Sequence, residues 1–349
     1  MLIAPDTFKG SLTAAQVASA LAEGMRGARP VRLVPVADGG DGTVDAALAA
    51  GFTGVEVPAH GPTGEPLDAL IAVRDGVAVV ETAAACGLVR LPGGRLAPMT
   101  ATSFGAGELV LAALDAGCRT IILGVGGSAS TDGGAGMLQA LGAGISGGVD
   151  LSTMDGRLAG AEIVLACDVD NPLLGPDGAA ATFGPQKGAS PAQVEQLERG
   201  LQRWATALGT ATGRDVADAP GAGAAGGIGY AALAGLGATR RPGIDVVLEL
   251  VGFDEQLAGA ELVITGEGSL DEQTLHGKAP AGVAERAAGI PVVAVAGRCL
   301  LTTERLNEAG IAAVYPLSDL EPDPTRSMAN AADLVRRIGA RIAEDWLGA

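Results

Sequence analysis

Hydrophobic and polar residues alternate along this chain in segments whose lengths and spacings predict both strands and helices. The apolar run at 2–4 stops at a proline and an aspartate, which predicts a short strand. Residues 14–25 carry apolar side chains at every fourth position, which predicts a helix capped by Ser11 or Thr13. A second apolar run at 31–36 predicts another strand. This alternation of strand and helix is typical of a parallel, doubly wound sheet.

The last third of the chain repeats this pattern, whereas the middle begins differently. In the last third we predict helices over 245–257, 280–288 and 325–347, and strands over 262–265, 291–296 and 312–315. In the middle we predict strands related as hairpins over 55–57, 67–73 and 77–81, further strands over 120–125 and 163–166, and helices over 105–116, 133–141 and 191–207.

These segments predict two α/β domains. Residues 1–45 and 240–349 form a Rossmann-like parallel-sheet domain built from both termini, and residues 46–239 form a second α/β domain inserted into it. We expect the active site in the cleft between the two domains.

Composition and charge exclude several classes of protein. Hydrophobic residues make up 48% of the chain, but no apolar run reaches the ~20 residues of a membrane span. The start of the chain lacks a signal segment, so we expect a cytoplasmic protein without a membrane partner. A net charge of −17 argues against a nucleic-acid partner. The four cysteines are dispersed, which favours buried thiols, and two histidines cannot form a multi-histidine metal site. The oligomeric state is left open.

Polar residues gather where the predicted strands end, which is where parallel α/β sheets bind ligands. The candidate segments are 6–9, 38–43, 126–134, 168–171 and 267–278. Acidic loop residues are often only solvated, so position alone does not establish a site.

The lysines are the sharpest clue in the composition. The chain has twenty arginines and three lysines, Lys9, Lys187 and Lys278, and all three occupy predicted loops. Lysine is a compact point charge suited to phosphate or carboxylate, which favours a role in binding anions. The alternative is that three surface lysines fall in loops by accident.

The glycine-rich segment 124–136 follows a predicted strand and opens a predicted helix. Glycine permits close backbone approach, and free amides at the start of a helix attract phosphate. We therefore predict that the nucleotide cofactor is bound by Gly126, Gly127, Ser128, Ser130, Asp132 and Gly133. The alternative is a tight turn in which Asp132 caps the helix.

Two other nucleotide motifs are absent or out of context. The chain lacks the glycine-rich lysine motif of P-loop kinases. Residues 221–226 match a dinucleotide-binding glycine pattern, but no predicted strand precedes them, so the pattern favours helix packing or a hinge over an NAD-linked oxidoreductase.

Taken in order, the motifs resemble those of the class I glycerate kinase family over nearly the whole chain. The matching segments are Pro5-Asp-Thr-Phe-Lys-Gly-Ser-Leu12, Pro35-Val-Ala-Asp-Gly-Gly-Asp-Gly-Thr43, Thr102-Ser-Phe-Gly105, Gly126-Gly-Ser-Ala-Ser-Thr-Asp-Gly-Gly-Ala-Gly136, Ala166-Cys-Asp-Val-Asp-Asn-Pro-Leu173, Phe183-Gly-Pro-Gln-Lys-Gly188, Pro220-Gly-Ala-Gly-Ala-Ala-Gly-Gly227 and Thr265-Gly-Glu-Gly-Ser-Leu-Asp271. Two departures stand out: the stretch 144–158 is shorter than in the family, and the chain starts closer to its first strand.

The resemblance implies two α/β domains around a cleft and transfer of the ATP γ-phosphoryl group to glycerate, usually at the 2-hydroxyl. Phosphoryl transfer depends on positioning and charge neutralisation, so Mg²⁺ is expected with the ATP. The alternatives are phosphorylation at the 3-hydroxyl and a sensor that binds nucleotide or phosphometabolite without turnover.

Within that reaction we predict a role for each remaining candidate. Asp168 is the predicted base because it ends an apolar strand, which can hold it rigidly, although an aspartate here also suits a turn. Lys9 and Lys278 are the predicted catalytic cations. The other predicted roles are substrate binding by Asp6, Asp38, Lys187 and Arg298 and metal binding by Glu267 and Asp271.

Overall fold

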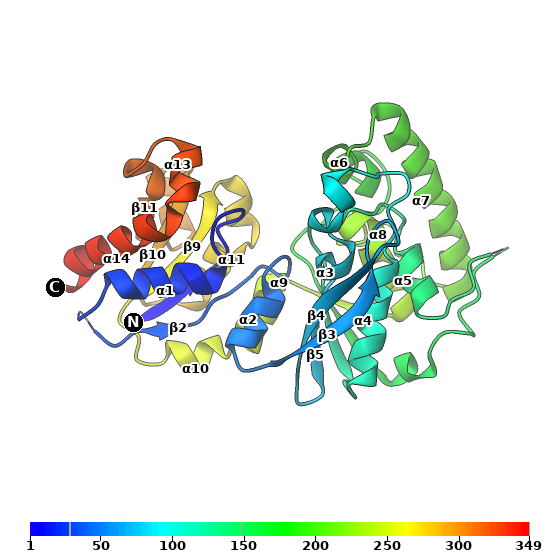
Figure 1. Ribbon diagram of the computed structural model, residues 1–349, viewed down its shortest axis with the longest axis horizontal. Helices are drawn as coiled ribbons and strands as arrows, with labels where there is room; N and C mark the ends of the chain where they lie inside the picture. Colours follow the sequence, from blue (N-terminus) through cyan, green and yellow to red (C-terminus); the bar gives the residue numbers. More distant parts are fainter. Residues whose placement is uncertain (28, 147, 349) are drawn as a thin grey trace. The chain divides into compact units, whose positions relative to one another are not determined.

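A computed structural model describes residues 1–27, 29–146 and 148–348 and divides the chain into two compact units (Figure 1). Unit 1 comprises Met1–Asp38, Asp45–Gly51 and Ile244–Ala349, and unit 2 comprises Gly39–Val44 and Phe52–Gly243. The fold is mixed α/β with parallel sheets, which confirms the predicted fold class. The predicted domain boundaries and the cleft stay predictions.

Unit 1 is built on a parallel sheet with the strand order β11-β10-β9-β1-β2. Its strands are β1 (Leu2–Pro5), β2 (Arg32–Leu33), β9 (Val263–Leu270), β10 (Val292–Cys299) and β11 (Ala313–Pro316). Strand β1 pairs with the edge strand β2 on one side and with the central strand β9, about 260 residues later in the chain, on the other. The carboxyl ends of β9, β1 and β2 therefore lie side by side.

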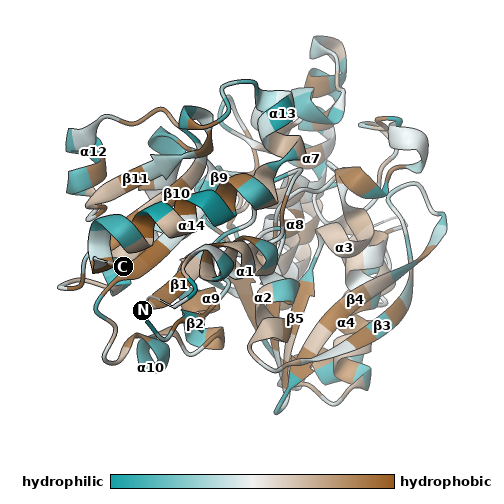
Figure 2. Cartoon of the chain, turned by 60° about the vertical axis from the view of Figure 1, so that its left-hand side comes forward, coloured by the Kyte–Doolittle hydropathy of each residue, from teal (hydrophilic) through white to brown (hydrophobic). Residues whose placement is uncertain are grey.

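Helices cover both faces of this sheet. They are α1 (Ala14–Gly24), α2 (Thr43–Ala49), α9 (Gly243–Leu250), α10 (Phe253–Leu257), α11 (Ala279–Arg286), α12 (Thr303–Glu308), α13 (Pro324–Ala329) and α14 (Ala331–Leu347). Successive residues of a strand point to opposite faces, so Ile3 packs with α1 and α14, whereas Leu2 and Ala4 pack with α9 and α11. Apolar and charged residues alternate along α14, whose apolar side chains join that core (Figure 2).

Helices α1 and α14 cross with their backbones in close contact. A Cβ atom at Gly24 would lie 1.9 Å from the carbonyl oxygen of Arg336, and one at Gly339 would lie 2.4 Å from that of Leu21. Glycine at both positions thus allows an approach that alanine would prevent. Thr13 caps α1 and forms a capping box with Gln16, which confirms one of the two predicted caps.

Unit 2 contains a six-stranded mixed sheet with the order β3-β4-β5-β6-β7-β8. The strands are β3 (Thr53–His60), β4 (Pro66–Arg74), β5 (Val77–Glu81), β6 (Thr120–Gly124), β7 (Glu162–Ala166) and β8 (Thr239–Arg241). The first three are antiparallel, as the predicted hairpins require, and β5 to β8 are parallel.

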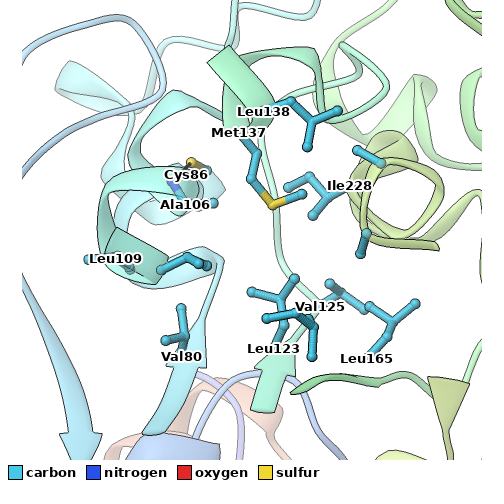
Figure 3. Close-up of a cluster of buried hydrophobic side chains, with 14 of the residues drawn as sticks. Val80, Cys86, Ala106, Leu109, Leu123, Val125, Met137, Leu138, Leu165 and Ile228 are labelled. Carbon is cyan, nitrogen blue, oxygen red and sulfur yellow. Dashed lines mark hydrogen bonds between the residues drawn. The ribbon is translucent and has the colours of Figure 1, made fainter. Parts of the chain in front are cut away.

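One large apolar core lies on a single face of this sheet. It is covered by α3 (Ala83–Cys86), α4 (Phe104–Asp115), α5 (Ala135–Ala140), α6 (Ala179–Phe183), α7 (Pro191–Thr212) and α8 (Ala224–Ala231). Figure 3 shows strand residues such as Val80, Leu123 and Leu165 facing helix residues such as Leu109, Met137 and Ile228. Three thiols, Cys86, Cys118 and Cys167, are buried in this core, whereas Cys299 of unit 1 is half-buried.

Several predicted boundaries are wrong, each for a local reason. The helix predicted over 245–257 is broken between α9 and α10, because Gly252 adopts a left-handed conformation with φ of 62°. The helix predicted over 325–347 is interrupted at Asn330, which lies between α13 and α14 and has a φ of −111°. Strands β9 and β10 extend to Leu270 and Cys299, beyond the predicted ends at residues 265 and 296. Within the stretch 144–158, Gly147 lies outside the described residues.

Candidate active site

The glycine-rich loop of unit 2, residues 126–134, joins β6 to α5. Gly127, Gly133 and Gly134 have φ angles of 60°, 69° and 74°, which side chains rarely adopt. The loop is fixed to the residues after β5, because Leu88 N–H donates to the Gly127 carbonyl at 2.9 Å and Ala129 N–H donates to the Cys86 carbonyl at 2.8 Å. These two bonds form an isolated antiparallel bridge between Gly87 and Ser128, which fixes the first half of the loop.

This loop carries polar groups that the protein itself does not satisfy. Within the part of the chain that the structure describes, the N–H groups of Gly127, Ser130 and Thr131 donate to no acceptor. The hydroxyl oxygens of Ser130 and Thr131 are buried and make no hydrogen bond in the same described part. Buried polar groups are normally paired, so a run of unpaired donors is typical of a ligand-binding loop.

Asp132 is committed to the fold of the loop. Its Oδ2 accepts from the Ser103 N–H and hydroxyl, both at 2.8 Å, and from the Gly136 N–H at 3.2 Å, while its Oδ1 accepts from the Gly134 N–H at 3.1 Å. The amides at the start of α5, which we expected to be free for phosphate, are thus occupied by Asp132. The donors available to a ligand lie earlier, between Gly126 and Thr131. The cofactor contact predicted for Asp132 is untested.

Lys187 lies beneath the same loop. It ends a 3₁₀ turn, Pro185–Lys187, and is only 2% exposed. Its Nζ donates to the Ser128 hydroxyl at 3.0 Å and to the Ser130 carbonyl at 2.5 Å. Burial lowers the pKa of Lys187 to about 8, against a smaller opposing effect of Asp132. This lysine is therefore a buried part of the loop's support, and its predicted contact with substrate is untested.

Two further glycine-rich segments pack against the loop. A Cβ atom at Gly226 would lie 2.0 Å from the Ser130 carbonyl oxygen, and one at Gly227 would lie 2.6 Å from the Gly133 Cα. A Cβ atom at Gly126 would lie 3.1 Å from the Gly40 Cα on the other side. Segment 221–227 therefore allows close packing against the loop. Close packing was one of the alternatives that the sequence suggested for these glycines.

Asp168 lies just after β7 and has a structural partner. Its Oδ1 accepts from the Gly243 N–H at 2.6 Å, where α9 begins. This bond satisfies one of the N–H groups that a helix leaves unpaired at its start. The carboxylate is half-buried, and its predicted role as a base is not tested by this contact.

Unit 1 gathers carboxylates at the carboxyl ends of three adjacent strands. Asp6 follows β1, Asp38 follows β2, and Glu267 lies within β9. The Asp6 N–H donates to the Gly266 carbonyl at 2.8 Å, which places Asp6 beside Glu267 in the sheet. Burial, followed by the charge of Asp38, raises the pKa of Asp6 well above its usual value. Asp6 and Glu267 are each 7% exposed.

Glu267 is held by one hydroxyl and one cation. The Thr274 hydroxyl donates to its Oε1, and Lys278 Nζ lies 3.9 Å from its Oε2. Burial raises the pKa of Glu267 to about 7, because the effect of burial is larger than the opposing effects of Thr274 and Lys278, which lower this pKa. A carboxyl that titrates near neutral pH suits proton transfer. The contact of Thr274 was not predicted from the sequence, since a threonine in a loop carries no signal of such a contact.

The other candidates of unit 1 lie near this cluster or on the surface. Asp271 accepts from the Gln273 N–H at 3.0 Å through its Oδ1 and caps a 3₁₀ turn, and its charge also raises the pKa of Glu267. Lys9 is exposed. Arg298 is exposed and donates to the Ser269 hydroxyl at 3.1 Å.

The side chains that could bind a metal ion can be compared with the ligands that Mg²⁺ prefers. Over residues 1–27, 29–146 and 148–348, no three His, Cys, Asp or Glu side chains are arranged to hold a metal ion by themselves. Glu267 and Asp271 are close enough to interact electrostatically, and Mg²⁺ commonly takes one or two carboxylates together with substrate phosphates. The two residues therefore fit Mg²⁺ that arrives with a nucleotide.

Most of the buried candidates fall into two clusters, one in each unit, while Asp168 lies apart from both. Unit 2 combines the glycine-rich loop with Lys187, and unit 1 combines three carboxylates with Lys278. In the same described residues, every helix is too short or too polar to span a bilayer. Unpaired loop donors are typical of a phosphate site, and buried acids beside a lysine are typical of a site that neutralises charge, so each cluster by itself fits a phosphotransferase of the small-molecule kinase class.

Comparison with known proteins identifies the family. The model of the "Glycerate kinase family" matches residues 1–347, so the chain belongs to the glycerate kinase family. It is 42% identical to a glycerate 2-kinase of Escherichia coli K12, over 98% of this chain and 97% of that protein. It is also 42% identical to a glycerate kinase of Bacillus subtilis 168, over 98% and 96%. The crystal structure of a Salmonella typhimurium LT2 protein described as glycerate kinase 2 matches with a TM-score of 0.83 and 40% identity, over 99% and 97%.

Proposed function

We propose that this chain is an ATP-dependent glycerate kinase that phosphorylates D-glycerate at the 2-hydroxyl. Its similarity to a glycerate 2-kinase over 98% of the chain carries this proposal. The alternative product, 3-phosphoglycerate, differs only in which hydroxyl is presented to the phosphoryl group. We also propose a cytoplasmic location, where ATP is available.

Unit 2 is the proposed nucleotide side of the reaction. The loop residues Gly126, Gly127, Ser128 and Ser130 supply backbone donors and hydroxyls to the phosphates of ATP. Support comes from the unpaired N–H groups and hydroxyls of this loop, which need acceptors. Gly133 contributes through its backbone conformation, and Asp132 holds the loop through four hydrogen bonds.

Unit 1 is the proposed source of the charge-neutralising, substrate-binding and metal-binding groups. Lys278 neutralises charge on the transferred phosphoryl group, while Lys9 and Arg298 bind anionic groups of the substrate. Asp6 and Asp38 bind its hydroxyls. Glu267 and Asp271 would hold the Mg²⁺ that accompanies ATP, and the ion would supply charge neutralisation at the phosphates.

The remaining role is that of the base, which orients the acceptor hydroxyl or accepts its proton. We propose Asp168 for it, and its bond to Gly243 supports the proposal because it fixes one oxygen. Glu267 is a second candidate for the base, as an alternative to its role as a metal ligand, because burial gives it a pKa of about 7. Substitutions at the two positions distinguish them.

The activity is tested by coupled detection of ADP with purified protein, Mg²⁺, ATP and each enantiomer of glycerate. We expect ADP release that depends on D-glycerate, and phosphorus NMR of the product to show a phosphate on the carbon that bears the carboxylate. Folded protein without turnover on either enantiomer, with ATP or other nucleotides, would overturn the kinase proposal. A 3-phosphoglycerate product would overturn the regiochemistry alone.

A further inference from the structure

The buried ammonium of Lys187 is the feature of unit 2 that the proposed reaction does not yet use. Its Nζ donates to one hydroxyl, that of Ser128 at 3.0 Å, and to one carbonyl, that of Ser130 at 2.5 Å. Both acceptors are neutral. No carboxylate among the described residues lies within 4.0 Å of this Nζ, and the side chain is 2% exposed.

A buried cation without a counter-ion is costly, so its retention calls for a compensating anion. Asp132 acts on Lys187 from the loop, but both of its oxygens are occupied by the amides of Gly134 and Gly136 and by Ser103. The turn Pro185–Lys187 and the segment around Gly226 bring no ionisable group to the ammonium. The positive charge is therefore incompletely balanced within unit 2.

The bond from Lys187 to Ser130 also fixes the direction of the loop's donors. A trans peptide points its carbonyl and its N–H in opposite directions. Because the Ser130 carbonyl is turned toward Lys187, the N–H of Thr131 is turned away from it, and this N–H has no acceptor within the described chain. Gly226 leaves the room this requires, since a Cβ atom there would lie 2.9 Å from Nζ.

We propose that Lys187 is a positioning residue of the nucleotide site: its ammonium orients the 126–134 loop, and phosphate bound on that loop completes its charge balance. The proposal rests on the proposed function, since it takes the phosphates of ATP as the ligand. In this proposal Lys187 does not contact the substrate directly, but acts through its hydrogen bonds to Ser128 and Ser130. Phosphate affinity, and not recognition of the adenosine or of glycerate, then depends on this lysine.

A dependence of binding on pH follows. Burial lowers the pKa of the free-state ammonium to about 8, and a bound phosphate raises it again. Below pH 8 the lysine is already protonated, so affinity is highest there. Above pH 8 a proton must be taken up on binding, and affinity falls by up to about tenfold per pH unit. Phosphate groups titrate near pH 6, so a change of MgADP affinity above pH 7.5 reports the protonation of the lysine and not that of the phosphates.

The experiment measures the affinity of MgADP and of adenosine by calorimetry from pH 7 to 9.5, with wild type, Lys187→Met and Lys187→Gln. Arg199→Gln is the matched control, since it removes an exposed cation that pairs with exposed Glu195, 3.8 Å away on α7 of the same unit. Steady-state kinetics supply KM for ATP and for D-glycerate. The pH dependence of MgADP affinity in the wild type is measured without any variant, so it tests the proposal even where a variant folds poorly.

We expect both Lys187 variants to bind MgADP about 10- to 100-fold more weakly at pH 7, with adenosine affinity and KM for glycerate within about twofold of wild type. The wild-type loss of MgADP affinity above pH 8 should vanish in Lys187→Gln and persist in Arg199→Gln. A flat wild-type profile, or equal losses for MgADP and adenosine, would overturn the proposal. Wild type that neither binds MgADP nor turns over glycerate would instead refute the proposed function.

Discussion

Replacing Asp168 separates a base from a structural carboxylate, because the structure gives its Oδ1 a known partner. That oxygen accepts from the Gly243 N–H at 2.6 Å. Asparagine keeps an acceptor oxygen at the same place but removes the charge, whereas alanine removes both. The pair of variants therefore changes the base and the hydrogen bond to different extents.

The size of each effect can be worked from this contact. A hydrogen bond to a charged group contributes about 1.5–3 kcal/mol, so Asp168→Ala should lower Tm by about 3–12 °C at about 2–4 °C per kcal/mol. Asp168→Asn keeps a neutral bond and should lose about 1 kcal/mol. If Asp168 is the base, kcat in Asp168→Asn should fall by about 10²–10⁴, or about 2.7–5.5 kcal/mol of barrier.

The assay combines thermal unfolding with kcat at saturating D-glycerate and ATP, and with ATP affinity by calorimetry. We expect Asp168→Asn to remain folded and to bind ATP like wild type while losing turnover. Near-normal kcat in Asp168→Asn, with a large loss of Tm in Asp168→Ala, would refute the base and leave a residue that only caps α9. A rate restored by excess Mg²⁺ would also refute it, in favour of a metal ligand.

Three further predictions concern Glu267, Gly226 and Lys278. The folded state holds a proton on Glu267 up to pH about 7, whereas the unfolded state releases it near pH 4.5, so the stability of the fold decreases as pH rises through this window. Glu267→Gln removes this ionisation, and at pH 8 it should recover on the order of 3 kcal/mol of stability, measured as a higher Tm. Gly226→Ala should cost about 2–5 kcal/mol by denaturant unfolding, because the residue has a φ of 71° and its Cβ would meet the Ser130 carbonyl at 2.0 Å. Lys278→Met should lower kcat about 10²–10³-fold if this ammonium neutralises charge in the transition state.

Each of these has its own control and its own contrary result. A lower Tm of Glu267→Gln at pH 8 would mean that Glu267 is ionised and paired with Lys278. Gly213→Ala, at a φ of 68° with open space around it, isolates the backbone cost, and an equal cost for Gly226→Ala would mean that the close packing is unimportant. Arg286→Met removes a cation of α11 paired with Asp254, so equal rates for it and Lys278→Met would remove Lys278 from the chemistry.

Local pattern was enough to predict most of the elements and their order. Apolar spacing and a threonine cap define α1, and alternating strand and helix define the parallel sheet. The breaks at Gly252 and Asn330 were missed because apolar periodicity continues across both. The short strand β8 was missed because two of its three residues are arginines, which do not suggest a strand.

The contacts of the site residues depended on long-range structure. The sequence placed Lys187 in a loop, but it could not indicate that the lysine is hydrogen-bonded to Ser128 and Ser130, which lie 59 and 57 residues earlier. Likewise, Asp6 and Glu267 meet only because β1 pairs with β9. Spacing alone could indicate which residues end strands, but it could not indicate which strands are neighbours.

The position of β1 in its sheet also constrains the order of folding during synthesis. The ribosome makes β1 and β2 early, yet β9, the partner on the other side of β1, emerges only after all of unit 2. Until then, β1 exposes an unpaired edge, and α1 lacks α14, against which it packs. Unit 2 can fold as soon as residue 243 has emerged, so a stalled or truncated chain would carry one folded unit and one open, aggregation-prone sheet edge.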